Sequence, residues 1–278
     1  PVLVEEVKGF LGLRGGRYID CTVGTGSHAL WFLEALGSSG RLLGIDLDPY
    51  SLRFCEERLM PFRDLIKLRK GNFRDIGRIA REEGFCPCDG VFFDLGLSSF
   101  QLASGRGFSF YDDELDMRYD PNSGISAYDV VNGYSEDDLY RVFKRYGEER
   151  FSRKIAREIV RRRPIRSARE LSSLIESLIR GRKLHPATKV FQAIRIEVNG
   201  EIENLEAGLR GAFEVLKPGG RVVVISYHSL EDRVVKRFMR EKKALKLLTK
   251  KPVRPSMEEI EMNPRSRSAR LRAGEKRG

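Results

Sequence analysis

The stretch Asp20-Cys-Thr-Val-Gly24-Thr-Gly26-Ser-His28 decides the fold class of this chain. A short apolar segment, residues 17–21, precedes it, and residues 28–36 follow with apolar side chains at helical spacing. Glycines at a strand-to-helix turn let backbone N–H groups approach a ligand at the start of a helix. Ser27 is a residue type that caps helices, so we expect it to be the N-cap. The stretch therefore predicts a ligand-binding turn after the first strand of an α/β sheet.

Strands and helices are expected to alternate in the chain both before residue 95 and after residue 199. We expect strands over residues 41–46, 65–68, 90–94 and 221–226, and helices over residues 49–59, 74–83, 202–216 and 230–240. Residues 90–94 are apolar almost throughout, as in a strand buried on both faces. Strands that alternate with helices predict a mostly parallel sheet with helices packed against it.

No strand pattern is present between residues 95 and 199, where capping boxes at Ser135 and Ser167 begin helices instead. A connection of this length needs a core of its own, since α/β loops usually span about 2–6 residues. We therefore predict a discontinuous α/β domain, residues 1–104 and 206–278, and an inserted helical domain, residues 105–205. Residues 244–251 and 268–273 are expected to pair as an antiparallel hairpin, which completes seven strands.

The charge of the chain is unevenly distributed. The 278 residues carry a formal net charge of +11, and 41% of them are hydrophobic, enough for a substantial core. Residues 141–183 and 219–278 each carry a net charge of +10, whereas the remaining residues sum to −9. Two basic segments predict a surface for a polyanion, and the absence of a large aromatic face favours nucleic acid over a membrane. Solvated helix faces are the alternative interpretation.

Several classes of protein are not expected from this composition. No apolar run approaches the ~20 residues of a membrane-spanning helix, and no signal peptide is recognisable, so we expect a cytoplasmic protein without a membrane partner. The four cysteines form neither a disulfide framework nor a zinc motif. We therefore expect no metal.

Three interpretations of the glycine turn compete. The string from Gly24 to Ala29 satisfies the dinucleotide pattern G-x-G-x-x-A, and Asp46 follows at the place where a carboxylate accepts ribose hydroxyls. S-adenosylmethionine (SAM) needs acceptors for its amino group, and Asp20 is placed for that role. Asp94, at the end of the fourth strand, would lie near the sulfonium. We favour SAM over a dinucleotide or a purely structural turn.

Polar residues also follow two other strands. The segment from Asp94 to Gln101 leaves the fourth strand, and the segment from Tyr227 to Asp232 leaves the fifth. Carboxyl ends of parallel strands meet at the edge where open α/β sheets bind ligands. His228 is therefore a candidate for the same site, although a capping or core histidine is an equally good interpretation.

Long strings from nearly the whole chain resemble the bacterial 16S ribosomal RNA cytosine-N4 methyltransferase family, also called the MraW or RsmH family. They are Val2-Leu-Val-Glu-Glu6, Asp94-Leu-Gly-Leu-Ser-Ser99, Arg106-Gly-Phe-Ser-Phe110, Leu115-Asp-Met-Arg118, Tyr146-Gly-Glu-Glu-Arg-Phe151, His185-Pro-Ala-Thr188, Phe191-Gln-Ala-Ile-Arg-Ile-Glu-Val-Asn199, Ser229-Leu-Glu-Asp-Arg233 and Asn263-Pro-Arg-Ser-Arg-Ser268.

The resemblance implies a class I, Rossmann-like SAM-dependent methyltransferase fold with a mostly parallel seven-stranded sheet and an inserted helical subdomain. We expect residues 1–104 and 206–278 to form the SAM-dependent methyltransferase domain and residues 105–205 to recognise the substrate. It implies N4-methylation of a cytidine in the decoding centre of 16S rRNA, with the small ribosomal subunit as partner, and it leaves open whether the protein is a monomer or a homodimer. Ser27 departs from the family, which usually has a third glycine there. The cofactor contacts it implies are Gly26, Ser27, His28, Asp46, Phe73, Asp94 and Gln101, besides Asp20 and Gly24 from the turn itself.

A mechanism follows as a hypothesis. Asp94 or Ser98 would accept hydrogen bonds from the cytosine amino group, and His228 or Asp232 would take its proton. No metal is required. Phosphates of the RNA would be held by the basic residues Arg161, Arg162, Arg163, Lys250, Lys251, Arg265 and Arg267.

Rival functions remain at this point. The chain could methylate adenine in RNA or DNA, or could assist ribosome assembly by sensing SAM without turnover. A nicotinamide oxidoreductase is the more distant alternative.

Overall fold

The computed structural model describes residues 1–179 and 184–278, which form two compact units. The first comprises Pro1–Gly96 and Ile202–Gly278, and the second comprises Leu97–Glu201. The structural division thus lies eight residues before the predicted boundary at 104 on one side and four residues before the predicted boundary at 205 on the other. The assignment of separate functions to the two units stays a prediction.

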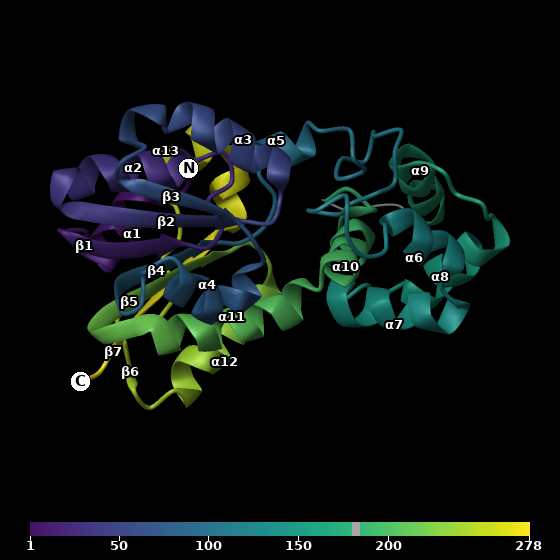
Figure 1. The fold of residues 1–278 in the computed structure, drawn as a ribbon. Helices are drawn as coiled ribbons and strands as arrows, with labels where there is room; N and C mark the ends of the chain where they lie inside the picture. The colour runs from purple at the N-terminus through teal and green to yellow at the C-terminus, as the bar shows by residue number, and fades with distance from the viewer. Residues whose placement is uncertain (180–183) are drawn as a thin grey trace. The chain divides into compact units, whose positions relative to one another are not determined.

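A seven-stranded sheet forms the centre of the first unit, with strands in the order β3-β2-β1-β4-β5-β7-β6 (Figure 1). The first five strands run parallel, while β7 pairs antiparallel with both β5 and β6. The predicted sheet and the predicted antiparallel hairpin are therefore confirmed. The strands are β1 (Gly16–Asp20), β2 (Gly40–Asp46), β3 (Ile66–Lys70), β4 (Cys88–Asp94), β5 (Leu216–Ser226), β6 (Leu245–Leu247) and β7 (Arg270–Lys276).

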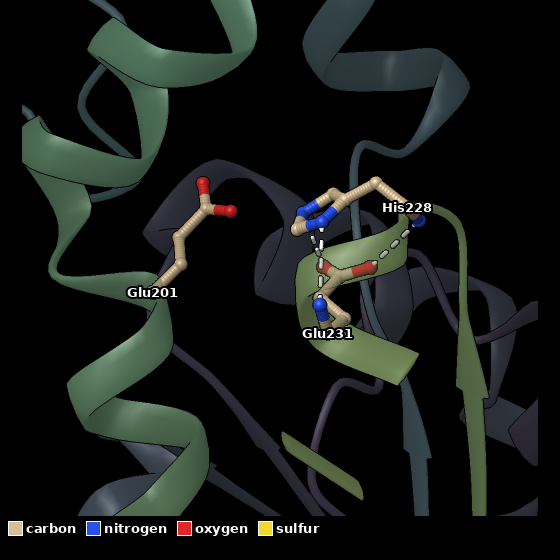
Figure 2. Close-up of side chains that lie close together, drawn as sticks. All are labelled: Glu201, His228 and Glu231. Carbon is tan, nitrogen blue, oxygen red and sulfur yellow. Dashed lines mark hydrogen bonds and ion pairs between the residues drawn. The ribbon is translucent and has the colours of Figure 1, made fainter. Parts of the chain in front are cut away.

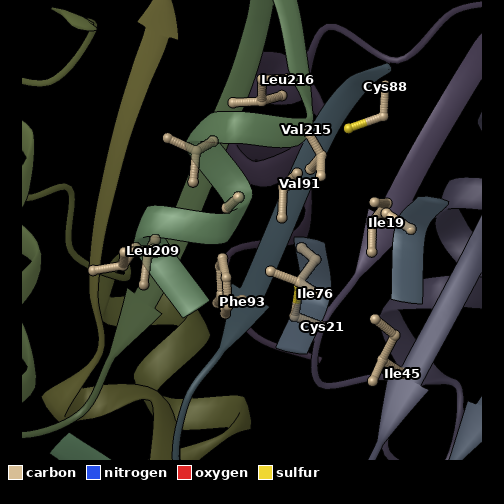
Figure 3. Packing of buried hydrophobic residues seen from close by; sticks show 14 of the residues in the cluster. Ile19, Cys21, Ile45, Ile76, Cys88, Val91, Phe93, Leu209, Val215 and Leu216 are labelled. Atoms are coloured by element: carbon tan, nitrogen blue, oxygen red, sulfur yellow. The ribbon is translucent and has the colours of Figure 1, made fainter. Parts of the chain in front are cut away.

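Helices cover both faces of this sheet. One apolar cluster joins the sheet to α4 (Ile76–Glu82), α11 (Glu201–Val215) and α12 (Ser229–Glu241), and Figure 3 shows part of its packing. Phe93 and Val91 of β4 are fully buried there. The other cluster joins the sheet to α1 (Val4–Leu11), α2 (Ser27–Leu36) and α3 (Pro49–Arg58). The sheet is thus covered by apolar packing on both faces, and α13 (Met257–Met262) is a short helix after β6.

The second unit is helical, as the capping boxes predict. Ser135 and Ser167 each accept a hydrogen bond from a backbone N–H in the first turn of the helix that follows. Phe143 and Ile155 are fully buried in the core of this unit. Its helices are α5 (Ser99–Leu102), α6 (Ala127–Gly133), α7 (Glu136–Gly147), α8 (Ser152–Arg161), α9 (Ala168–Leu178) and α10 (Thr188–Asn199).

One local prediction is wrong. Gly26, not Ser27, is the N-cap of α2, in the left-handed conformation at φ 83°. Ser27 is the first helical residue, and its hydroxyl accepts a hydrogen bond from the Arg58 guanidinium at 2.7 Å. Because Ser27 is already inside the first turn of α2, its hydroxyl does not occupy the capping position. Among the described residues, no helix has the length and apolar character that a membrane span requires.

Candidate active site

Three neighbouring strands end in aspartates at one edge of the sheet. Asp20, Asp46 and Asp94 are the last residues of β1, β2 and β4, and β1 lies between the other two. Parallel pairing places Asp20 opposite Gly44 and Phe92, so the three carboxylates share the carboxyl edge. This edge is where open α/β sheets bind their ligands. The structure therefore brings together three residues that the sequence nominated for one site.

Asp20 is buried, and only one of its two carboxylate oxygens has a hydrogen-bond partner among the described residues. Its Oδ1 atom accepts a hydrogen bond from the Thr22 N–H at 3.0 Å, whereas its buried Oδ2 atom has no hydrogen-bond partner among the described residues. Burial, together with the nearby carboxylates of Asp94 and Asp46, raises the pKa of Asp20 to about 8, although the bond from the Thr22 N–H lowers it. A buried acceptor without a donor is costly in a folded protein unless a ligand satisfies it.

Asp46 holds the glycine turn in place. Its Oδ2 atom accepts from the Gly24 N–H at 2.7 Å, and its Oδ1 atom accepts from the Asp48 N–H at 2.9 Å. Burial raises the pKa of Asp46 to about 6, although these backbone donors lower it. A carboxylate oxygen can accept two hydrogen bonds, so Asp46 can organise the turn and still receive ribose hydroxyls.

Gly26 is required by space as well as by conformation. A Cβ atom on this residue would lie 3.0 Å from the Cys55 sulfur and 3.2 Å from Leu59 on α3. One side of the glycine turn therefore packs directly against the C-terminal end of α3. The other side of the turn faces the carboxyl edge of the sheet.

Asp94 is fixed from three directions. Its backbone N–H donates to the Thr22 hydroxyl at 2.7 Å, and the Tyr227 hydroxyl donates to its Oδ1 atom at 2.8 Å. The other carboxylate oxygen lies 3.4 Å from Nδ1 of His28. Burial raises the pKa of Asp94, while His28 and the bond from Tyr227 lower it. Sequence reasoning missed Tyr227, although its place directly after β5 at the carboxyl edge was an available signal.

His28 connects the start of α2 to this carboxylate. Its Nε2 atom lies 3.0 Å from the Val2 carbonyl oxygen, and its ring packs edge-on against Phe92. Burial lowers the pKa of His28, and the nearby Asp94 opposes that shift. The Val2 N–H also lies within hydrogen-bonding distance of Nε2, at 3.4 Å, so Val2 holds one ring nitrogen while Nδ1 faces the Asp94 carboxylate.

His228 acts as a helix cap in this structure (Figure 2). Its Nδ1 atom accepts from the Glu231 N–H at 3.3 Å, and the Glu231 carboxylate accepts from the backbone N–H groups of Tyr227 and His228. These reciprocal bonds form a capping box at the start of α12. Nδ1, one of the two ring nitrogens that could take a proton, is thereby engaged.

Asp232 is paired with a buried arginine. The Arg272 guanidinium donates to both of its carboxylate oxygens, at 2.6 and 3.2 Å. Arg272 lies on β7 and is only 8% exposed. The pair therefore ties α12 to the sheet and occupies the oxygens that the sequence nominated for proton transfer.

The remaining predicted cofactor and catalytic residues lie in two places. Phe73 packs edge-on against Phe93 with ring centroids 5.5 Å apart, so it belongs to the core beneath the carboxyl edge. Ser98 and Gln101 lie in the second unit, where they form the capping box of α5. The side-chain oxygen of Gln101 accepts from the Ser98 N–H at 3.1 Å.

The residues nominated for RNA differ in how much of their charge is neutralised. Arg161 and Arg162 both form ion pairs with Glu158. Arg163 donates to two backbone carbonyls, those of Val131 and Tyr134. The others are exposed and lie after β6, namely Lys250, Lys251, Arg265 and Arg267.

The charge of the carboxyl edge distinguishes the candidate ligands. The ionised carboxylates of this edge repel a pyrophosphate, whereas SAM carries an ammonium group and a sulfonium that they attract, and an ammonium beside Asp20 favours its ionised form. The unpartnered oxygen of Asp20 fits the ammonium as an acceptor. The residues present therefore fit SAM and disfavour a dinucleotide.

Comparison with known proteins agrees with this geometry. The family described as "MraW methylase family" matches residues 1–277. A ribosomal RNA small subunit methyltransferase H from Thermomicrobium roseum is 48% identical, covering 99% of this chain and 93% of the relative. Proteins of the same name from Carboxydothermus hydrogenoformans and Persephonella marina are 47% and 46% identical, covering 99% of this chain and 97% and 98% of the relatives. The fold is that of class I methyltransferases, SAM is the cofactor, and the chain belongs to the MraW methylase family.

Proposed function

We propose that this methyltransferase acts on ribosomal RNA, and that it methylates the N4 amino group of a cytidine in the decoding centre of 16S rRNA in the cytoplasm. The relatives named as ribosomal RNA small subunit methyltransferases support the substrate class. The observation that carries the proposal is the fixed carboxylate of Asp94 at the end of β4, beside the acceptors suited to SAM.

The substrate amine is a poor nucleophile, because its lone pair is delocalised into the cytosine ring. When bound, SAM supplies an electrophilic methyl group. Asp94 accepts a hydrogen bond from the amino group, which orients the nitrogen and increases its electron density. Tyr227 and His28 keep that carboxylate in one position, so orientation supplies much of the lowering of the barrier. The base must leave its stack to reach this edge.

The nitrogen gains a methyl group and must lose one proton. The sequence nominated His228 and Asp232 as acceptors, but Nδ1 of His228 caps α12, its Nε2 atom lies 3.2 Å from the Glu231 carboxylate, and Asp232 is held by Arg272. Asp94 is the better acceptor, because burial raises its pKa and makes its carboxylate a stronger base. Ser98 stays a candidate acceptor from the sequence alone, and its hydroxyl oxygen accepts from the Gln101 N–H in the capping box of α5.

One experiment tests the proposal directly. The protein is incubated with methyl-labelled SAM and with either unmodified small subunits or naked 16S rRNA, and the labelled nucleoside is identified by mass spectrometry. We expect N4-methylcytidine. A label on adenine would replace the proposed target, and SAM binding without transfer to either RNA would indicate a non-enzymatic factor.

A further inference from the structure

A hollow of about 500 Å³ lies on the first unit, away from the carboxyl edge of the sheet. Three elements contribute to it: the end of α12 with the loop after it, the strand β6, and the C-terminal end of β7. We call it the cationic hollow. Its lining residues are Met239, Arg240, Lys242, Lys243, Leu245, Lys246, Leu247 and Arg277.

The hollow lies at the end of the sheet opposite the carboxyl edge. Strand β5 reaches the carboxyl edge at Ser226, which pairs with Arg270, and begins its regular pairing with β7 at Arg221 and Glu275. Leu245 pairs with Lys276, beyond Glu275 and therefore past that far end. Helix α12 starts beside the carboxyl edge and ends at the hollow, and its 13 residues span about 20 Å. Figure 1 shows α12, β6 and the C-terminus on this side of the unit.

Its cations are not neutralised by the protein. Arg240, Lys243, Lys246 and Arg277 are exposed, and Lys242 is partly buried beside the Phe213 ring. Within residues 1–179 and 184–278, none of these five forms an ion pair with a carboxylate. Glu241 is the single acid in the same turn, and the acid on the neighbouring strand, Glu275, is paired with Arg221.

Cations at the opposite edge of the sheet are ion-paired, unlike those of the cationic hollow. Lys67 and Arg69 of the edge strand β3 are both paired with carboxylates of the α4 region, Glu82 and Glu83. The basic surface of α8 behaves in the same way, as its arginines are paired with acids. The five cations of the hollow differ from the cations of β3 and α8, because they converge on one concave surface and none forms an ion pair with a carboxylate among the described residues.

Two local explanations account for part of this charge. Cations near the end of α12 interact favourably with the helix dipole, and lysines on an edge strand discourage pairing with other sheets. The dipole acts only within the last turn and does not explain Lys246 or Arg277. Protection of a sheet edge from pairing needs charge only along the edge strand. It does not explain why cations from three elements surround one hollow.

We propose that the cationic hollow binds phosphates of the RNA backbone outside the nucleotide that is methylated. This inference rests on the proposed RNA substrate. Unpaired cations at a concave surface focus positive potential, and they gain the most from a phosphate because no internal ion pair must be broken. Since the hollow lies about 20 Å from the carboxyl edge along α12, the RNA must extend well beyond the target nucleotide.

The test removes three exposed cations of the hollow together: Arg240→Gln, Lys243→Gln and Lys246→Gln. Binding of a long fluorescent 16S rRNA fragment is measured by anisotropy at several salt concentrations between about 50 and 200 mM. We expect a loss of affinity of about 10-fold or more at low salt, and a slope of log K against log salt that is shallower by about 2. SAM binding and the thermal unfolding midpoint should stay as in the wild type.

A matched control removes the same charge from the opposite sheet edge: Lys67→Gln, Arg69→Gln and Arg78→Gln, three cations that are ion-paired in the structure. We expect this variant to bind RNA within about 2-fold of the wild type, since paired cations contribute little to phosphate binding. Equal losses in the two variants would show that only net charge matters, and would overturn the proposal.

Two further measurements separate the possible failures. Unchanged RNA affinity in the hollow variant, with weaker binding to vesicles rich in phosphatidylserine, would assign the hollow to a membrane surface and overturn the proposal. Methyl transfer to RNA by the wild type is scored in parallel. If the wild type fails to methylate RNA, the proposed function fails, whereas the RNA-binding comparison still decides whether the hollow holds phosphates.

Discussion

The Tyr227 hydroxyl donates a 2.8 Å hydrogen bond to Asp94, on the carboxylate oxygen opposite the one that faces His28. This bond crosses from the end of β5 to the end of β4 and stabilises the ionised form of Asp94. Tyr227 therefore acts as a positioning residue for the proposed acceptor.

Replacement of Tyr227 by Phe should lower methyl transfer about 10- to 100-fold, the usual value of a hydrogen bond to a charged group. Loss of the bond should also raise the pKa of Asp94, because the bond lowers it in the wild type. If transfer needs ionised Asp94, the acid limb of the pH–kcat profile moves to higher pH. A fall in kcat with an unmoved profile would contradict this role. Tyr18→Phe, which removes a bond to the Gly12 carbonyl away from the carboxyl edge, is the control.

Asp20→Asn should stabilise the protein without SAM while weakening SAM binding. Folded Asp20 has a pKa of about 8, against 3.8 for the free side chain, so the folded state keeps a proton that the unfolded chain releases. Wild-type stability therefore falls as pH rises from about 4 to about 8, and asparagine removes this loss. The difference in unfolding midpoint between variant and wild type should grow over that range and level off above it. A constant difference would show that Asp20 ionises normally.

The same variant should bind SAM about 10-fold or more weakly, because an amide cannot pair with an ammonium group as a carboxylate does. Isothermal titration at pH 8.5 measures this difference. Equal affinity in both proteins would remove Asp20 from the cofactor site.

Gly26→Ala should cost more stability than an ordinary glycine replacement. The residue has φ 83°, and a Cβ atom would lie 3.0 Å from the Cys55 sulfur. We expect a loss of about 2–3 kcal/mol in the free energy of unfolding, from backbone strain and the clash together. Gly84→Ala, at φ 79° with open space around the Cβ position, isolates the strain and should cost about 1 kcal/mol. Chemical denaturation compares the two, and equal losses would mean that the contact with α3 is unimportant.

The ion pair of Asp232 and Arg272 predicts a structural effect. Arg272→Met should reduce stability by about 3 kcal/mol, because it leaves a partly buried carboxylate without its partner. The double variant with Asp232→Leu should regain most of that loss and keep methyl transfer within a few-fold of the wild type. A double variant that folds and binds SAM but transfers no methyl groups would instead establish Asp232 as catalytic.

The parts of the fold that follow from periodicity were predictable. Asp20, Asp46 and Asp94 follow apolar strands, and the rule that parallel strands end at one edge brings them together. The capping role of His228 was also readable, since Glu231 stands three residues later at capping-box spacing. What sequence could not supply was the reach of individual side chains, such as the bond from Tyr227 to Asp94, because such contacts depend on distances between elements.

The sequence analysis also missed one helix and ended one strand too early. Helix α10 lies in a segment that was quoted only for its family resemblance, and β7 extends to Lys276, three residues past its predicted end at Ala273. The net charge of residues 141–183 also overstated the cations available to RNA. Pairing of Arg161 and Arg162 with Glu158 is a matter of side-chain geometry, and a count of residue types does not contain it.

The position of β7 between β5 and β6 has a consequence for synthesis of the chain. Residues 270–276 form an interior strand, so the side of β5 that they cover stays open until these residues have left the ribosome. Strands β1 to β4 can pair much earlier, and residues 97–201 form their own contacts in the meantime. Completion of the sheet is thus a late, long-range event, during which the apolar β5 is exposed to aggregation or to chaperones.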